Sequence, residues 1–246
     1  MVYIKRESEL NSMRKAGLIL RDVLELVQEN AKVGVTTKKL DTLAYDYIKK
    51  QNATPSFLGY LNFPATLCIS IDDEVVHGVP GERVIEEGML VKIDAGVKLN
   101  GFHTDAARTI ELGAVSDIKH KITQVCKESF FQGIAKLKSG VRLGEYSHTV
   151  QQYAESAGFS VVRVLGGHGI GRTVHEDPFI PNFGLPSYGL RIRSGMTMAL
   201  EPMINAGTYE VSYTDNGTVI TADGSPSAHY ENTIIVTDDG VEIITL

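Results

Sequence analysis

The sequence contains no tryptophan, only two cysteines, and no run of apolar residues long enough to cross a membrane. A membrane-spanning helix needs about 18 or more mostly apolar residues in a row, so we expect no contact with a bilayer. Cys68 and Cys126 form neither a CxxC pair nor a dense cysteine framework, which is typical of a reducing cytoplasm. The first 30 residues carry several charges and no apolar core of a secretory signal, which favours the same location.

Basic residues are also in the minority. The chain has 24 Lys and Arg against 30 Asp and Glu, so its formal net charge is -6. Proteins that hold nucleic acid neutralise phosphates with clustered Lys and Arg, and the sequence has no such cluster. Its 246 residues, 43% of them hydrophobic, are enough to bury a substantial core. We therefore expect a globular protein without a nucleic-acid partner.

The order of apolar patterns along the chain predicts two similar halves, each with two helices followed by strands. In the first half, just after the strand predicted at 89–97, the Asn100-Gly101 pair is a signal for a two-residue hairpin turn. The predicted order is a helix at 7–30, a second helix capped by Thr36 or Thr37, a loop at 51–64, strands at 65–76 and 89–97, a strand from the hairpin turn to about 110, a helix from Ser116, a helix at 143–157, and strands at 160–165, 196–204 and 232–235.

Three short motifs recur in the same order in the two halves. Residues 31–35 resemble 137–141, Gly88-Met89-x-x-x-Ile93-Asp94 matches Gly195-Met196-x-x-x-Leu200-Glu201, and His103-Thr104-Asp105 matches His229-Tyr230-Glu231. Each match alone is weak, but three at like places in one series indicate an internal duplication. We predict a single α/β (α+β) domain, 1–246, whose halves, about 7–112 and 116–246, share one sheet system.

The duplication draws attention to four acidic residues: Asp94, Asp105, Glu201 and Glu231. Asp94 and Glu201 lie in apolar runs, so we expect both to be buried. An unpaired buried carboxylate costs several kcal/mol or takes up a proton, and only Lys92 and Arg108 stand nearby in the sequence. A surface ion pair or a turn would explain any one of these acids. The four together favour a pair of divalent cations.

The histidines point to the kind of metal site. His168 is at the centre of residues 166–171, which contain four glycines. A flexible turn with an incidental histidine is one interpretation, and a phosphate-binding loop is a weaker one because the segment lacks a Lys and a GxGxxG frame. One imidazole with four carboxylates and no thiolate suits Mn, Fe(II), Co(II) or Zn at a catalytic pair. Such a pair activates water and polarises a carbonyl.

Five motifs, in their order, resemble those of type I methionine aminopeptidases. The motifs are Ile93-Asp94-Ala95-Gly96 with Gly101–Thr109, Gly167–Gly171, His175-Glu176-Asp177-Pro178, Glu201-Pro202-Met203 and Tyr230-Glu231-Asn232-Thr233. The resemblance covers nearly the whole chain. It implies the pita-bread fold, in which two pseudo-two-fold halves of helix-helix-strand-strand order surround a central antiparallel sheet.

The resemblance also implies a dinuclear metal site and a reaction. The matching metal ligands are Asp94, Asp105, His168, Glu201 and Glu231. Glu201 would also act as general base, His175 would stabilise the oxyanion, and His77 would contact the peptide on its leaving-group side. The implied activity is removal of the initiator methionine, by attack of a metal-bridging hydroxide on the first peptide carbonyl. The two ions would be Co, Mn, Fe or Zn.

A methionine pocket is implied as well, lined by His77, Tyr60, Phe63, Cys68, Val174 and His175. Two departures remove bulk there: Gly217 stands where many relatives carry Trp, and Val174 where relatives often carry Phe or Met. The implied partner is the N-terminal peptide of a nascent protein with a small penultimate residue, with transient ribosome contact and a monomeric enzyme. No role is assigned to His103, His120, His148 and His229, which we expect at the surface or around the site.

Three alternatives stay open at this point. One is a peptidase of the same fold that cleaves Xaa-Pro bonds, although such relatives usually carry a separate N-terminal domain. Another is a non-enzymatic binding protein that kept the fold, although such proteins lose metal ligands. The third is a metallohydrolase acting on a non-peptide amide such as creatine, which tends to be longer.

Overall fold

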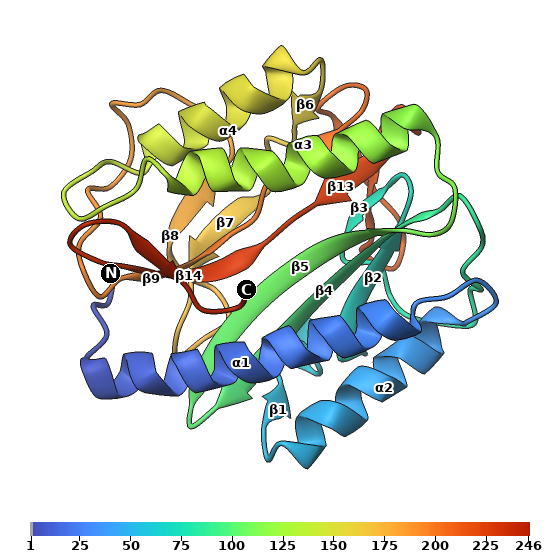
Figure 1. Ribbon diagram of the computed structural model, residues 1–246, viewed down its shortest axis with the longest axis horizontal. Helices are drawn as coiled ribbons and strands as arrows, with labels where there is room; N and C mark the ends of the chain where they lie inside the picture. The colour runs from blue at the N-terminus through green and yellow to red at the C-terminus, as the bar shows by residue number, and fades with distance from the viewer. Residues whose placement is uncertain (1) are drawn as a thin grey trace.

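Two helix pairs enclose a layer of strands in the computed structural model, which describes residues 2–246 (Figure 1). In the view of Figure 1 one pair lies below the strands and the other above them. The lower pair is α1 (Glu7–Asn30) and α2 (Thr37–Lys50), and the upper pair is α3 (Asp117–Ile134) and α4 (Gly144–Ser156). The strands lie between the two helix pairs, and their pairings with one another in residues 2–246 are antiparallel, as predicted.

The sheet of the first half is built around β4 (Leu90–Leu99). This strand pairs with β2 (Leu67–Ile71) and β5 (Phe102–Glu111), and its end also pairs with β1 (Thr54–Pro55). The predicted hairpin turn joins β4 to β5: Asn100 and Gly101 have φ values of 52° and 84°. Both residues are thus left-handed, as a two-residue hairpin turn of type I′ requires.

The sheet of the second half has the strand order β15-β14-β9-β7-β8. Its members are β7 (Gly166–Gly169), β8 (Glu176–Pro181), β9 (Thr197–Leu200), β14 (Asn232–Val236) and β15 (Val241–Ile243). The two sheets meet where β5 passes the start of β14, because the Glu231 N–H donates to the Ala107 carbonyl at 3.0 Å. This seam brings acidic residues from opposite halves of the chain together.

Six shorter strands form two further three-stranded sheets, of order β13-β10-β6 and β11-β12-β3. They are β3 (Glu74–Val76), β6 (Ser160–Val161), β10 (Met203–Asn205), β11 (Val211–Tyr213), β12 (Val219–Thr221) and β13 (Ser227–His229). Within the first of these sheets, His229 of β13 pairs with Met203 of β10. The end of β13 is therefore fixed just before Glu231.

Matched hydrogen bonds show the duplication in the structure. The Gly34 N–H donates to the Ile85 carbonyl at 2.9 Å, and in the second half the Gly140 N–H donates to the Ile192 carbonyl at 2.8 Å. Gly34 and Gly140 have nearly the same backbone conformation, with φ of 88° and 89°. The turn that follows the first helix of each half is thus built in the same way, in agreement with the predicted pseudo-two-fold fold.

Several predicted segments differ in extent from the structure. The strand predicted at 160–165 covers only Ser160–Val161, and the loop predicted at 51–64 contains β1 and a 3-10 turn at Tyr60–Asn62. The strand predicted at 196–204 is divided into β9 and β10, because Pro202 has no N–H to continue the ladder. This break frees Glu201 from the sheet, so that its side chain enters the site.

Residues 166–171 do not form a flexible turn but lie largely in strand β7. A Cβ atom on Gly167 would stand 2.4 Å from the Ala199 carbonyl oxygen of β9, and one on Gly169 would stand 2.1 Å from the Asp177 carbonyl oxygen of β8. The glycines therefore allow close approach to neighbouring strands, which holds the His168 side chain in place. Within residues 2–246, no helix has both the length and the apolar character needed to cross a membrane.

Candidate metal centre

The five predicted ligands line one cavity at the seam between the two sheets: Asp94, Asp105, His168, Glu201 and Glu231. Asp94 and Asp105 come from β4 and β5, where Asp94 faces Ala107, two residues beyond Asp105. Residues two apart on a strand point to the same face, so the two aspartates lie diagonally across the pair. Glu201 and Glu231 follow β9 and precede β14, at the same end of that paired ladder.

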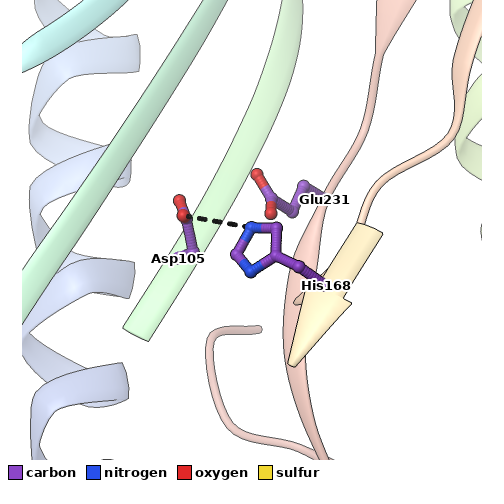
Figure 2. Close-up of side chains that lie close together, drawn as sticks. All are labelled: Asp105, His168 and Glu231. Atoms are coloured by element: carbon purple, nitrogen blue, oxygen red, sulfur yellow. Dashed lines mark ion pairs between the residues drawn. The ribbon is translucent and has the colours of Figure 1, made fainter. Parts of the chain in front are cut away.

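Figure 2 shows Asp105, His168 and Glu231 pointing toward one another from three separate segments. The Nε2 atom of His168 is 4.0 Å from Oδ2 of Asp105 and 3.7 Å from Oε1 of Glu201. These distances are too long for hydrogen bonds. Two ligand atoms that share an ion at about 2.1 Å each are roughly 3.0–3.5 Å apart. The spacing is therefore closer to that of atoms around a common cation.

The carboxylates have no cationic side chain as a partner. Lys92 is buried but its Nζ donates to the backbone carbonyls of Asp72 and Ser227, at 2.7 and 3.1 Å. The Arg108 guanidinium likewise donates to backbone carbonyls, including that of Glu231 at 2.6 Å. Within residues 2–246, ion pairs to the site carboxylates come from histidines alone. The two basic residues that are near these acids in the sequence, Lys92 and Arg108, are thus directed elsewhere.

Burial changes the protonation of these acids strongly. It raises the pKa of Asp94 to about 7 and that of Glu201 to about 8. Burial, followed by repulsion from the neighbouring carboxylates, raises the pKa of Asp105 and Glu231 well above the usual range. Buried oxygens of Asp94 and Asp105 also lack a hydrogen-bond partner. Divalent cations would satisfy these oxygens and hold the carboxyl groups in their ionised form.

His168 is prepared to act as a neutral ligand. Its Nδ1 lies 2.9 Å from the Gly169 carbonyl oxygen, which can only accept, so Nδ1 carries the proton. The Nε2 lone pair therefore faces the carboxylates. Burial, with repulsion from His175 as a lesser cause, lowers the pKa of His168 to about 3. A neutral imidazole among carboxylate oxygens suits divalent Mn, Fe, Co or Zn, so the residues present fit such ions.

The other two predicted catalytic histidines line the same cavity. The His175 ring stands edge-on to His168, with 4.2 Å between the ring centroids, and its Nδ1 is 2.8 Å from the Tyr60 hydroxyl. His77 has a left-handed backbone with φ of 62°, and burial lowers its pKa to about 4. Both imidazoles are therefore neutral near pH 7, since burial lowers the pKa of His175 as well.

The cavity has a volume of about 300 Å³ and one largely apolar wall. Phe57, Tyr60, Phe63 and Cys68 contribute to this wall. Burial raises the pKa of the Cys68 thiol well above its usual value, so Cys68 is a wall residue and not a nucleophile. Val174 is buried in the same apolar cluster but is not among the cavity-lining residues.

Gly217 lies at the cavity, as the resemblance implied. A Cβ atom added there would meet no atom within 4 Å, so this side of the cavity is open. Its φ of 86° is also a conformation that disfavours residues other than glycine. The cavity is also lined by five residues that the sequence did not predict: Phe57, Leu61, Asn62, Pro64 and Asn216.

His229 is the main residue of the site that sequence reasoning missed. Its side chain is 1% exposed, and Nε2 lies 3.5 Å from Glu201 Oε2 and 3.8 Å from Glu231 Oε2. Its position two residues before Glu231 was a usable signal, because residues two apart in extended chain share a face. The other histidines without an assigned role form hydrogen bonds away from the site. The Nδ1 atoms of His103, His120 and His148 are hydrogen-bonded to the Ser56 hydroxyl, the Glu111 carboxylate and the Gly184 carbonyl, respectively.

Comparison with known sequences identifies the family. The profile of metallopeptidase family M24 matches residues 11–238. A methionine aminopeptidase from Clostridium perfringens is 51% identical over 100% of this chain and 99% of that protein. Methionine aminopeptidase 1 from Bacillus subtilis is 46% identical, again over 100% of this chain and 99% of its own length.

Solved structures agree with these sequence matches. The crystal structure of methionine aminopeptidase from Thermotoga maritima superposes with a TM-score of 0.98 at 40% identity, covering 100% of this chain and 99% of that one. An Xaa-Pro dipeptidase from Bacillus anthracis is less similar, with a TM-score of 0.81 at 26% identity, and this chain covers only 61% of it. The chain therefore belongs to metallopeptidase family M24 and, within that family, to the methionine aminopeptidases.

Proposed function

We propose that this protein removes the N-terminal methionine from peptides and nascent proteins, with divalent ions bound by Asp94, Asp105, His168, Glu201 and Glu231. One observation carries the proposal: four carboxylates, two of them buried and two partly buried, and a neutral imidazole converge in one cavity without a cationic side chain. We further propose that two ions bind, because four carboxylates can neutralise the charge of two divalent cations. When bound, the ions supply an activated water and polarise the scissile carbonyl.

The chain's own residues complete the reaction. The carboxylate of Glu201 accepts the proton released by the attacking water and passes it to the departing amine. His175 donates a hydrogen bond from Nε2 to the oxygen of the scissile carbonyl as charge develops there. His77, on the same cavity, contacts the peptide on the leaving-group side. Because the metal-binding carboxylates lie within the cavity, a free α-amine placed against them restricts cleavage to the first residue.

The apolar wall of the cavity accounts for the preference for methionine. Phe57, Tyr60, Phe63 and Cys68 surround a space that a flexible, polarisable thioether fills well. The cavity is open on the side of Gly217, and we expect small penultimate residues to be preferred. A cytoplasmic location is supported by the two cysteines, which are free and buried. Ribosome contact and a monomeric state stay predictions.

A peptide panel tests this function. The protein is stripped with a chelator, reloaded with Co, Mn, Fe or Zn, and assayed on peptides beginning Met-Ala, Leu-Ala, N-acetyl-Met-Ala and Ala-Pro. We expect metal-dependent release of the first residue from Met-Ala only, or far faster than from the other three. Rapid cleavage of Ala-Pro would favour the Xaa-Pro peptidase instead. Cleavage of the acetylated peptide would contradict recognition of the free amine.

A further inference from the structure

His229 is an unexplained group at the edge of the metal centre. It is 1% exposed, and its Nε2 atom has no hydrogen-bond partner among the described residues. A buried polar atom without a partner is costly, typically about 1–3 kcal/mol. The backbone on which it stands is fixed from one side, because the His229 N–H donates to the Thr109 hydroxyl and the hydroxyl donates to the His229 carbonyl. The backbone of His229 is thus held in this position.

The ring faces the carboxylates in the same way as His168. Nε2 of His168 is 3.7 Å from Oε1 of Glu201, and Nε2 of His229 is 3.5 Å from Oε2 of the same residue. The Glu201 carboxylate therefore has one imidazole on each of its oxygens. His229 also approaches Glu231, whose Oε2 is 3.8 Å away, so that Glu201, His229 and Glu231 present ligand atoms within 4.8 Å of one another.

These distances favour an ion over a hydrogen bond. An imidazole N–H bonded to a carboxylate oxygen lies at about 2.7–3.2 Å, shorter than either distance from His229. Ligand atoms around one ion of tetrahedral geometry are roughly 3.4 Å apart. We propose that His229 Nε2 is a second imidazole ligand of the metal centre, binding an ion together with Glu201 and Glu231. The inference rests on the proposed metal-dependent function, and it adds a histidine to the ligand set that the family resemblance implies.

A second imidazole would change which metals the protein prefers. Carboxylate and water ligands suit Mn, whereas imidazole ligands suit Zn, Fe and the later divalent metals. We therefore expect replacement of His229 to weaken Co(II) and Zn(II) binding more than Mn(II) binding. Gln is the informative replacement, because its amide donates a hydrogen bond over a similar reach but is a poor substitute for a nitrogen ligand.

Proton NMR of the cobalt(II)-loaded protein tests the proposal. Each imidazole bound to Co(II) gives a strongly shifted ring N–H signal that disappears in D₂O. The wild type should show two such signals, and His229→Gln should lose one and bind Co(II) at least about 10-fold more weakly, since removal of a group that only hydrogen-bonds a ligand already costs about 10–100-fold. The matched control is His120→Gln, since His120 is exposed and pairs with Glu111. It should keep both signals and the wild-type affinity.

Other outcomes separate this inference from the proposed function. A single shifted signal that persists in His229→Gln but vanishes in His168→Gln would support the metal centre and overturn the ligand role of His229. Wild-type Co(II) affinity in His229→Gln would also overturn that role, since it would assign a hydrogen bond. No shifted signal and no Co(II) binding in the wild type would contradict the proposed function itself. If His229→Gln does not fold, the count of ¹⁵N-labelled histidines coupled to bound ¹¹³Cd in the wild type gives the same answer.

Discussion

Tyr60 takes part in the site through its hydroxyl as well as its ring. The sequence assigned it only to the apolar wall, but its hydroxyl lies 2.8 Å from Nδ1 of His175. A phenol that donates to Nδ1 leaves the imidazole proton on Nε2. That is the tautomer in which His175 can donate to a developing oxyanion. The arrangement makes Tyr60 a positioning residue for His175.

Removing this hydroxyl should slow the reaction without releasing the metals. Loss of one hydrogen bond is worth about 1 kcal/mol, so Tyr60→Phe should lower kcat about fivefold while metal content stays unchanged. The measurement is kcat on a Met-Ala peptide together with metal analysis of the same sample. Tyr213→Phe is the control, because that side chain is 62% exposed. An unaltered kcat in Tyr60→Phe would show that His175 does not depend on the bond.

The individual site residues differ in how well the sequence predicts them. Asp94 and Glu201 occupy matching places in a duplication, and their apolar surroundings are visible in the chain. Both line the predicted cavity, although they are partly rather than fully buried because they face its open space. The Tyr60–His175 bond spans 115 residues and depends on how a 3-10 turn packs against another loop. No local pattern carries that information.

Strand β7 shows a limit of sequence reasoning at the level of elements. Helix α2 begins where its capping residue predicts, because the hydroxyl of Thr36 accepts from the Lys39 N–H. Glycine is unfavourable in strands, so Gly166–Gly169 does not resemble one. Its glycines are required because β8 and β9 approach on both sides. This requirement arises only from the packing of the whole sheet.

A methyl group at Gly167 should therefore displace β7 and the His168 side chain with it. In Gly167→Ala the new Cβ would stand 2.4 Å from a backbone oxygen of β9, and such overpacking costs about 1–3 kcal/mol. We expect a lower Tm and weaker metal binding, measured by thermal denaturation and metal titration. Gly81→Ala is the control, since a Cβ there meets no atom within 4 Å. Equal Tm values for the two variants would contradict the packing argument.

For the whole molecule, the charge of the site links metal binding to stability. An unfolded chain ionises its carboxyl groups near pH 4, whereas burial raises the pKa of Asp94 to about 7 and of Glu201 to about 8. Asp105 and Glu231 shift in the same direction. Above pH 6.5 the metal-free folded protein thus holds more protons than the unfolded chain, so its free energy of unfolding falls as the pH rises.

The metal-free protein should therefore lose stability between about pH 6.5 and 8. Each excess proton contributes about 1.4 kcal/mol per pH unit. Burial lowers the pKa of His168 and His229, so near pH 6.5, where unfolded histidine is about half protonated, they oppose this trend; by about pH 7.5 they are neutral in both states and no longer do so. Lys92, whose pKa burial lowers to about 7, offsets one carboxyl above that pH. Thermal denaturation in chelator should give a Tm that falls with pH, whereas saturating Co(II) should remove the fall. The same pH trend with and without Co(II) would contradict the linkage.

The central claim is that the buried carboxylates and His168 hold ions on which methionine release depends. The most direct measurement is the rate of methionine release from a Met-Ala peptide as Co(II) is added to chelated protein, in the wild type and in Asp94→Ala and His168→Ala. We predict no turnover without metal, a rate that rises with added Co(II) in the wild type, and none at saturation in either variant. Undiminished turnover in the chelator, or a wild-type rate in either variant, would contradict the account.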